Sequence, residues 1–423
     1  MKEATKKEFL VALAVFAIGT LLLAAACALY FYTKQPIKIG ILHSLTGSQA
    51  MSEKPLIDAE LMAIDEINQH GGIIGRKIIP IIKDGKSDEK IFAAQAENLI
   101  NDEKVDAIIG CWTSASRKAV KAVVEKHDNL LIYPVSYEGI EDSSHILYTG
   151  ATQNQQITVC ALWSFYNLGK KFFLVGSDYI FSRTANQIIK NVVASVNGEV
   201  VGEDYILLGA ADASGMVAKI LAAKPDIIIN TIQGESNVAF FKELRLQGIT
   251  AEKIPVMSIS SVTEVEFAQI GNSAMAGDYV TASYFQSLET EQNAHFVAQF
   301  KQKYGSDRVL NEACEAGYNG VHFWAQAIAD AKSSQANQVK KYLHDRVLNA
   351  PAGIVYTDHE SFNTWKMVYV GKLRADGQFS IIWDSKKTIK PVNYPIFKQK
   401  ESWDQFIKDL YESWGNRWSR QTG

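Results

Sequence analysis

The sequence predicts an α/β fold made of two doubly wound lobes, each a parallel sheet covered by helices. Three observations support this prediction. The chain has 423 residues, which is long for a single core of ordinary size. Hydrophobic residues make up 47% and charged residues 21%, the balance of a globular protein with a substantial core. From residue 37 onward, β-rich runs alternate with runs of helical periodicity, and the alternation starts again near residue 155.

The first 34 residues differ from this body. An uncharged run of 23 residues, 10–32, would be about 34 Å long as a helix and could cross a hydrocarbon core of ~30 Å. Lysines before the run favour a cytoplasmic stub at the N-terminus, with residues 35–423 outside the cytoplasmic membrane. We therefore expect residues 1–34 to hold a transmembrane anchor. The alternatives are a cleaved signal peptide, whose apolar region is usually shorter, and a lipoprotein signal ending at Cys27.

The first alternating series begins directly after this segment. Strands are predicted at IKIGILHSL, KIIPIIKDG, VDAIIG and NLLIYPV, and helices at LIDAELMAIDEINQ, IFAAQAENLINDE and KAVKAVVEKH. In the second series, strands are predicted at KKFFLVGSD, GEVVGEDYILL, PDIIINTI and IPVMSIS, and helices at TANQIIKNVVASV, GMVAKILAAK and SNVAFFKELRLQG. GGIIG at 71–75 follows a helix and precedes a strand, the reverse of a dinucleotide-binding fingerprint, so we interpret it as a helix end and a turn.

Composition also excludes several functions. The net charge is −3 and no long basic run occurs, which argues against a nucleic-acid partner. The four cysteines are widely spaced and form no CxxC or Cys/His cluster. The sequence therefore predicts neither a disulfide framework nor a metal site, and no cofactor.

The loops at the carboxyl ends of the predicted strands are candidates for ligand binding, because ligands of open parallel sheets sit there. They read HSLTGSQAMSE, DGKSD, GCWTSASRK, YPVSYEG, GSDYIFSR, TIQGES and SISS. Hydroxyls and aromatic rings are frequent in them, whereas histidine and lysine are rare. This composition favours a small, neutral, hydrogen-bonding ligand in a cleft between the lobes.

The same loops resemble the urea and short-chain amide receptors of ABC transporters, which are type I periplasmic binding proteins of the branched-chain amino-acid receptor superfamily. The resemblance runs from about Ile37 to Pro395 and is carried by HSLTG, GCWTSASRKAV, YPVSYEG, YTGATQNQQ, KKFFLVGSDY, RTAN, NTIQGESNVAFFKEL, YFQS and RADGQFSIIW. It implies a Venus-flytrap fold whose lobes exchange strands and close on one ligand. The first lobe is then expected at 35–150 plus 283–349, and the second at 151–282 plus 350–395.

A receptor for urea or an amide must match each polar group of its ligand, since an unpaired buried polar group costs about 1–3 kcal/mol. Ser114 and the backbone near Thr113 can donate to the ligand carbonyl, and the hydroxyls of Tyr133 and Tyr179 can accept from its N–H groups. Trp112 offers a flat wall that excludes water. The resemblance implies the same pocket for Trp112, Ser114, Tyr133 and Tyr179. The candidate ligand-binding residues are Trp112, Thr113, Ser114, Tyr133, Glu138, Asp178, Tyr179 and Glu235.

Each candidate has a structural alternative. Trp112 could pack between the lobes, and Ser114 could cap the helix that follows it. Arg117 and Lys118 are expected to form a solvated face in the first turn of that helix. Glu138 could instead make hydrogen bonds within its own loop.

The two remaining acidic candidates lie in the second series. Asp178 could hydrogen-bond within its loop and the hinge. Glu235 stands where the resemblance implies an acidic or small polar residue. At both positions, ligand contact and a local structural role stay open.

The C-terminal segment 396–423 contains ESWDQFIKDLYESWGNRWSRQ, in which aromatic and aliphatic residues recur every three or four positions. This pattern predicts an amphipathic helix that ends or is interrupted at Gly415. The helix could pack on its own lobe, dock on a partner or lie at the membrane interface.

Two functions follow from these features. The first is a membrane-anchored extracytoplasmic receptor that closes on urea or a short-chain amide and delivers it to an ABC permease. The alternative is a sensory receptor that reports occupancy to a signalling partner such as a kinase or cyclase. Enzymatic activity is not expected, because no sequence feature pairs His43 with the nucleophile candidates Cys111 and Ser114.

Overall fold

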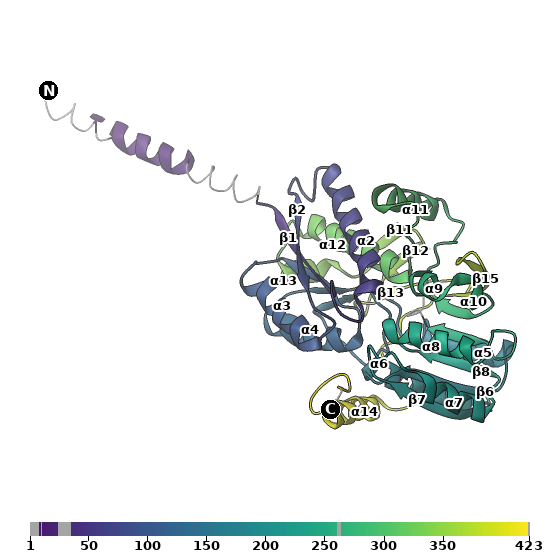
Figure 1. The fold of residues 1–423 in the computed structure, drawn as a ribbon. Coiled ribbons are helices and arrows are strands. Elements are labelled where there is room, and N and C mark those ends of the chain that lie inside the picture. The colour runs from purple at the N-terminus through teal and green to yellow at the C-terminus, as the bar shows by residue number, and fades with distance from the viewer. Residues whose placement is uncertain (1–7, 10, 24–34, 260–263, 422–423) are drawn as a thin grey trace.

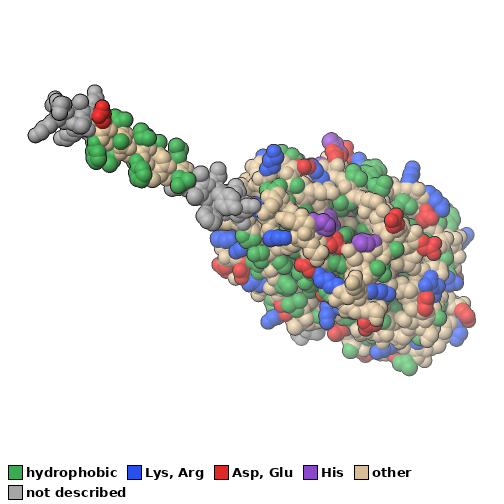
Figure 2. Space-filling view, turned by 90° about the horizontal axis from the view of Figure 1, so that it is seen from above, with side chains coloured by type: hydrophobic (Ala, Val, Ile, Leu, Met, Phe, Trp, Pro, Cys, Tyr) green, Lys and Arg blue, Asp and Glu red, His purple; other side chains and the backbone are tan. Residues whose placement is uncertain are grey.

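The computed structural model describes residues 8–9, 11–23, 35–259 and 264–421 (Figure 1). Residues 11–23 form a helix that projects from the body, with exposed apolar side chains such as Phe16 and Leu21 (Figure 2). The predicted anchor at 10–32 therefore lies partly outside the described residues. Within the described ranges, no helix combines the length and the apolar character needed to span a membrane.

The first lobe is built on a parallel five-stranded sheet in the order β2-β1-β3-β4-β5. Its strands are β1 (Ile37–His43), β2 (Ile78–Asp84), β3 (Ala107–Gly110), β4 (Leu131–Tyr133) and β5 (Ile146–Tyr148). The connecting helices are α2 (Ala50–Gln69), α3 (Glu89–Asn101) and α4 (Ser114–Lys126). β3 and β4 are buried throughout, as expected of strands with helices on both faces.

A later part of the chain returns to this lobe. α11 (Glu291–Tyr304) and α12 (Glu312–Ala331) pack against α2, and α12 also contacts β3 and β4. The chain continues through α13 (Ala336–Val339) and the 3₁₀ turn η1 (Lys340–Tyr342). A three-stranded antiparallel sheet follows, made of β11 (Val347–Ala350), β12 (Gly353–Thr357) and β13 (Thr364–Trp365).

The second lobe is built on a seven-stranded sheet in the order β15-β14-β10-β9-β8-β6-β7. Its strands are β6 (Lys171–Ser177), β7 (Glu199–Ile206), β8 (Ile227–Thr231), β9 (Val256–Ile259), β10 (Tyr279–Ala282), β14 (Tyr369–Leu373) and β15 (Phe379–Asp384). Its helices are α5 (Ile157–Asn167), α6 (Ile180–Ser195), α7 (Ser214–Ala223), α8 (Glu235–Leu246), α9 (Glu264–Ile270) and α10 (Asn272–Met275). The predicted two-lobe α/β architecture is thus confirmed.

The second sheet corrects one expectation, because it is mixed rather than wholly parallel. β14 pairs antiparallel with both β10 and β15. A short turn at 374–378 joins β14 to β15, and so short a connection can only join antiparallel strands. Gly377 has a φ of 81° in this turn, a conformation that favours glycine.

The C-terminal segment forms α14 (Lys400–Ser413), which lies against α6 of the second lobe (Figure 1). Trp403 and Ile407 are buried within the apolar core that α5 and α6 share with the sheet. The Trp403 indole N–H also donates to the Pro395 carbonyl at 3.1 Å. The spacing of apolar residues therefore packs this helix on a lobe of its own chain.

Candidate ligand-binding site

A small cavity lies between the two lobes, where strands of both sheets end. The first lobe contributes the loops after β3 and β4, and the second lobe those after β6 and β8. The lining residues are Trp112, Ser114, Val135, Ser136, Tyr179, Phe181 and Gln233. The space open to a water-sized sphere in the cavity is about 10 Å³, and none of these lining residues carries a formal charge.

The first-lobe wall is set by the turn between β3 and α4. Gly110 and Cys111 have φ values of 154° and 69°, which turn the chain sharply out of the strand. A side chain at Gly110 would meet the Leu42 carbonyl oxygen at 2.0 Å, so the close approach requires glycine. Thr113 is the N-cap of α4 and accepts the Ser116 N–H at 3.1 Å. Ser114 consequently begins the helix, at the edge of the cavity.

A buried network of charges holds the Ser114 hydroxyl from behind. Ser114 donates to Glu138 at 2.5 Å and accepts from the Arg117 guanidinium at 2.8 Å. Arg117 also pairs with Glu138 and Glu141, each at 3.0 Å, and Lys118 pairs with Glu141 at 3.0 Å. The orientation of the serine hydroxyl is therefore fixed before any ligand arrives.

This network corrects the expectation that Arg117 and Lys118 form a solvated helix face. Arg117 is fully buried and Lys118 is 8% exposed. The first turn of α4 faces the loop that contains Glu138 and Glu141, not water. Burial alone would raise the pKa of Glu141, but the charges of Lys118 and Arg117 hold that pKa well below its usual range. Glu141 is therefore ionised at neutral pH.

Two further predicted residues support the wall without lining the cavity. The Tyr133 hydroxyl donates to the Trp112 carbonyl oxygen at 2.9 Å. The Arg117 guanidinium lies 5.0 Å from the centre of the Tyr133 ring. Thr113 is occupied as the helix cap. For Thr113, Tyr133 and Glu138, direct contact with a ligand stays a prediction.

The second-lobe wall consists of two aromatic rings and an amide. Tyr179 precedes α6 directly, and its ring centre lies 6.1 Å from that of Phe181. No hydrogen bond joins the Tyr179 hydroxyl to another residue in the described part of the chain. The Gln233 backbone N–H donates to the Ser177 hydroxyl at 3.1 Å, which holds the loop after β8 against the end of β6. This wall has fewer polar partners than the first-lobe wall.

One hydrogen bond closes the cavity across the lobes. The Trp112 indole N–H donates to the Gln233 side-chain oxygen at 3.2 Å. Nearby, the lobes also touch through backbone, because the Glu235 N–H donates to the Ser48 carbonyl at 3.3 Å. Gly234 has a φ of 58°, and a side chain there would meet that carbonyl at 2.5 Å. The two lobes are therefore in close contact around the cavity.

The remaining predicted residues lie outside the cavity lining. Asp178 pairs with Arg183 at 2.8 Å, and Glu235 is exposed at the start of α8. The cavity is lined by residues of the predicted strand-end loops, but four of its lining residues were not predicted, namely Val135, Ser136, Phe181 and Gln233. Their only signal was their place in the strand-end loops YPVSYEG, GSDYIFSR and TIQGES.

His43 is engaged in a separate buried cluster. Its two ring nitrogens contact Glu53 at 2.9 Å and Glu60 at 3.1 Å. Burial alone would lower the pKa of His43, but the charge of Glu60 and hydrogen bonds to both carboxylates raise it to about 10. Burial also raises the pKa of the Cys111 thiol well above its ordinary value. An imidazolium and a protonated thiol provide neither a base nor a nucleophile.

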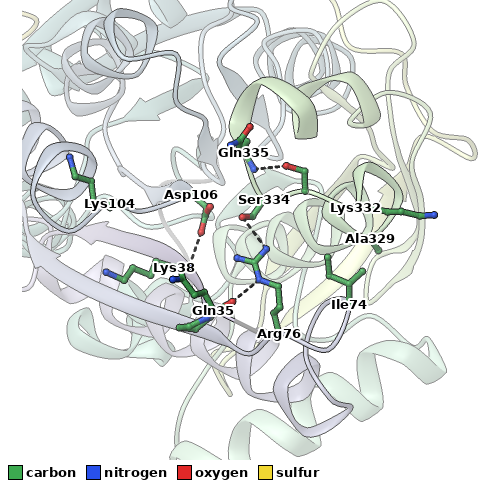
Figure 3. A pocket seen from close by; sticks show the side chains of 12 residues that line it. Gln35, Lys38, Ile74, Arg76, Lys104, Asp106, Ala329, Lys332, Ser334 and Gln335 are labelled. Carbon is green, nitrogen blue, oxygen red and sulfur yellow. Dashed lines mark hydrogen bonds between the residues drawn. The ribbon is translucent and has the colours of Figure 1, made fainter. Parts of the chain in front are cut away.

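A second, larger pocket lies at the opposite end of the first sheet, beside the amino ends of β1 and β3 (Figure 3). The Arg76 guanidinium there donates to the Gln35 carbonyl at 2.6 Å and to the Ser334 hydroxyl at 3.4 Å. The Lys38 N–H donates to Asp106 at 2.9 Å. All its lining residues belong to the first lobe, so it is not part of the interlobe site. Among the described residues, no group of three or more His, Cys, Asp or Glu could hold a metal ion.

The comparison with protein families decides what kind of protein carries this cavity. A family model for the periplasmic binding protein domain matches residues 37–400. The chain belongs to this family. Its members are periplasmic solute-binding proteins rather than enzymes, so the expectation of a non-enzymatic, extracytoplasmic receptor is confirmed.

The individual relatives described next share 30% identity or less with this chain over the matched residues. The chain is 23% identical to the Leu/Ile/Val-binding protein BraC3 of Rhizobium johnstonii, over 62% of this chain and 71% of that protein. It is 30% identical over 148 residues to a limonene hydroxylase of Geobacillus stearothermophilus, a match that covers 34% of this chain and only 27% of that protein. Among solved structures, an ABC-transporter solute-binding protein from R. palustris in complex with 4-hydroxybenzoate has a TM-score of 0.77 and 22% identity, covering 86% of this chain and 100% of that chain. This similarity supports the two-lobe fold.

Proposed function

We propose that this periplasmic binding protein is a receptor for urea or a short-chain amide, which it captures by closing its lobes and delivers to an ABC permease. The observation that carries the proposal is the small, uncharged cavity between the lobes. In this structure the space open to a water-sized sphere is only about 10 Å³, about what one water needs, so a ligand larger than water requires the lobes to separate slightly. A flat, neutral molecule fits such a space better than a branched or charged one.

The absence of charge on the lining residues argues against the ligands named for the relatives. Isoleucine and leucine carry a carboxylate and an ammonium group, and hydroxybenzoate carries a carboxylate. Burying such groups without a partner costs several kcal/mol. The guanidinium behind Ser114 is already paired with Glu138 and Glu141, which leaves it no free charge for a ligand carboxylate.

The polar groups around the cavity complement an amide. The Ser114 hydroxyl donates its proton to Glu138, so, contrary to the sequence prediction, it can only accept an N–H of urea, whereas the Gln233 side-chain N–H₂ can donate to the urea carbonyl. The Tyr179 hydroxyl, which has no hydrogen-bond partner among the described residues, adds a donor and an acceptor. Trp112, Tyr179 and Phe181 supply flat faces that limit the thickness of the ligand.

Thermal unfolding of the full-length protein tests the ligand class. We expect urea, formamide or acetamide to raise the Tm, and isoleucine and 4-hydroxybenzoate to leave it unchanged. Ser114→Ala should remove the response, while Ser144→Ala, at an exposed serine outside the cavity, should keep it. A rise in Tm with isoleucine or 4-hydroxybenzoate alone, or with none of the five compounds, would refute the amide assignment.

The N-terminal segment completes the proposal, because it would hold the receptor at the membrane beside its permease. Its support is the apolar run 10–32 and the exposed apolar helix at 11–23. Alkaline carbonate extraction of membranes should leave the full-length protein in the pellet. Release of the protein into the supernatant would contradict anchoring by this segment.

A further inference from the structure

The last described residues, 415–421, leave α14 and contact both lobes beside the ligand cavity. Gly415 and Asn416 have φ values of 68° and 60°, so the helix ends there in two left-handed residues and the chain reverses. The Asn416 N–H donates to the Tyr411 carbonyl at 3.0 Å. The ring of Trp418 then packs back on Tyr411, with ring centres 4.3 Å apart. This turn directs the chain end away from the helix axis.

On the second lobe, the segment pairs with the backbone on both sides of Tyr179. The Ile180 N–H donates to the Trp418 carbonyl at 3.0 Å, and the Arg420 N–H donates to the Asp178 carbonyl at 3.0 Å. These two bonds form an antiparallel bridge centred on Tyr179. Because Tyr179 lines the cavity, the segment fixes the backbone of a residue in the cavity wall.

On the first lobe, the segment is held by one carboxylate and one ammonium group. Glu89, the first residue of α3, accepts the Trp418 N–H with its two oxygens at 3.2 and 3.1 Å. The Lys118 ammonium lies 5.1 Å from the centre of the Trp418 ring. Glu89 is 8% exposed, so its bond to the segment is shielded from water. Charge-assisted hydrogen bonds and cation–π contacts of this kind are among the stronger polar contacts in proteins.

We propose that residues 415–421 form a clasp that holds the two lobes closed over the ligand and sets the position of Tyr179. α14 stays on the second lobe, since its apolar face is buried there. Opening of the lobes would therefore separate Trp418 from Glu89 and Lys118. A contact that exists only in the closed state shifts the equilibrium toward that state. The proposal rests on the proposed closure over a ligand and assigns part of the closing free energy to the C-terminus.

Distances between the lobes test the clasp in the full-length protein. Spin labels attached at Lys126→Cys on α4 and Leu221→Cys on α7, two exposed positions, report the distance between the lobes by double electron–electron resonance. In the protein with an intact clasp we expect a population in which the two labels lie close together. Glu89→Ala should reduce that population. Glu89→Gln should be intermediate, because its amide oxygen still accepts one N–H. Glu401→Gln, which removes an exposed carboxylate of α14, should leave the distribution unchanged.

Ligand release gives a second readout. With acetamide as the probe, Glu89→Ala should release it about ten-fold faster, the effect of losing about 1.4 kcal/mol of closed-state contact. Unchanged distances and release rates, or no short-distance population in any state of the unmodified clasp, would overturn the proposal. If Glu89→Ala does not fold, truncation after Asn416 removes the same contact from the other side. If acetamide does not bind, the proposed ligand fails, while the distances without ligand still decide the clasp.

Discussion

The two walls of the cavity are stabilised in different ways. The first-lobe wall rests on buried charges, with Arg117 and Lys118 paired to Glu138 and Glu141 directly behind Ser114. The second-lobe wall consists of the Tyr179 and Phe181 rings and the Gln233 amide. The first wall is therefore organised before the ligand binds.

This difference separates two tasks that a closing receptor must perform. A wall held by a full set of ion pairs keeps its geometry while the lobes move, so it can orient the first contact with the ligand. A wall with few internal partners gains most of its contacts on closure, so it contributes mainly to the stability of the closed state. We expect changes in the charged network behind the first wall to affect mainly folding, and changes in the second wall to affect mainly binding.

The largest effect is expected from Arg117→Met, which removes the central cation of the first wall. Glu138 would lose its buried cation and Glu141 one of its two, and breaking such a pair costs about 3–5 kcal/mol of unfolding free energy. Denaturant unfolding measures this change. Lys121→Met is the matched control on the same helix, since its pair with Glu125 is partly exposed and is worth below about 1 kcal/mol. Equal losses in the two variants would contradict a buried network.

The second largest effect concerns pH and the His43 cluster of the first lobe. The pKa of His43 is raised from 6.5 to about 10, so its protonated form stabilises the folded state fully below pH 6.5 and is lost as the pH rises toward 10. Between pH 7 and 9 the free energy of unfolding should fall by on the order of 2 kcal/mol. His43→Gln should flatten this slope, whereas His295→Gln, at an exposed histidine of α11, should not. If the free energy of unfolding of the wild type did not change between pH 7 and 9, His43 would be neutral in the folded state.

The contrast between the walls also explains how far the sequence could predict the site. Loop composition and the order of strands and helices identified the strand-end loops and placed Trp112, Ser114 and Tyr179 in them. Arg117 was misassigned because its partners lie 21 and 24 residues further along the chain. In the sequence, a charged first turn whose partners lie far along the chain has the same pattern as a charged first turn that faces water. Only the tertiary fold distinguishes the two.

Contacts between the lobes were still harder to predict. Trp112 and Gln233 are 121 residues apart, and Trp418 and Glu89 are 329 residues apart. No periodicity or motif links such positions, because their proximity depends on how one lobe closes on the other. The antiparallel pairing of β14 was missed for the same reason. It depends on how the chain returns to a sheet made of earlier strands.

A smaller effect, confined to binding, is expected from Tyr179→Phe in the second wall. The variant loses one hydroxyl that has no partner among the described residues, so we expect the free energy of unfolding to change by less than about 0.5 kcal/mol. Acetamide affinity, measured by calorimetry, should fall about ten-fold if that hydroxyl contacts the ligand. Tyr133→Phe is the counterpart in the first wall. It leaves the buried Trp112 carbonyl without its donor and should lower stability by about 1–3 kcal/mol. If Tyr179→Phe lowered stability and Tyr133→Phe lowered affinity instead, Tyr133 would be the ligand contact and Tyr179 the structural residue.

The smallest effect is expected from Gln233→Met, which keeps the length of the side chain but removes the acceptor for the Trp112 indole N–H. One neutral hydrogen bond contributes about 1 kcal/mol, so the Kd for acetamide should rise about 5-fold, while stability without ligand should change little. Glu235→Gln, two residues further along the same loop, is the control; its exposed side chain lies outside the cavity lining, so the Kd should stay within about two-fold. Together the two variants test whether the second wall acts through the bond across the lobes or through the charge of its loop. A larger loss for Glu235→Gln would move the ligand toward the start of α8, because the exposed carboxylate would then have to lie close to it.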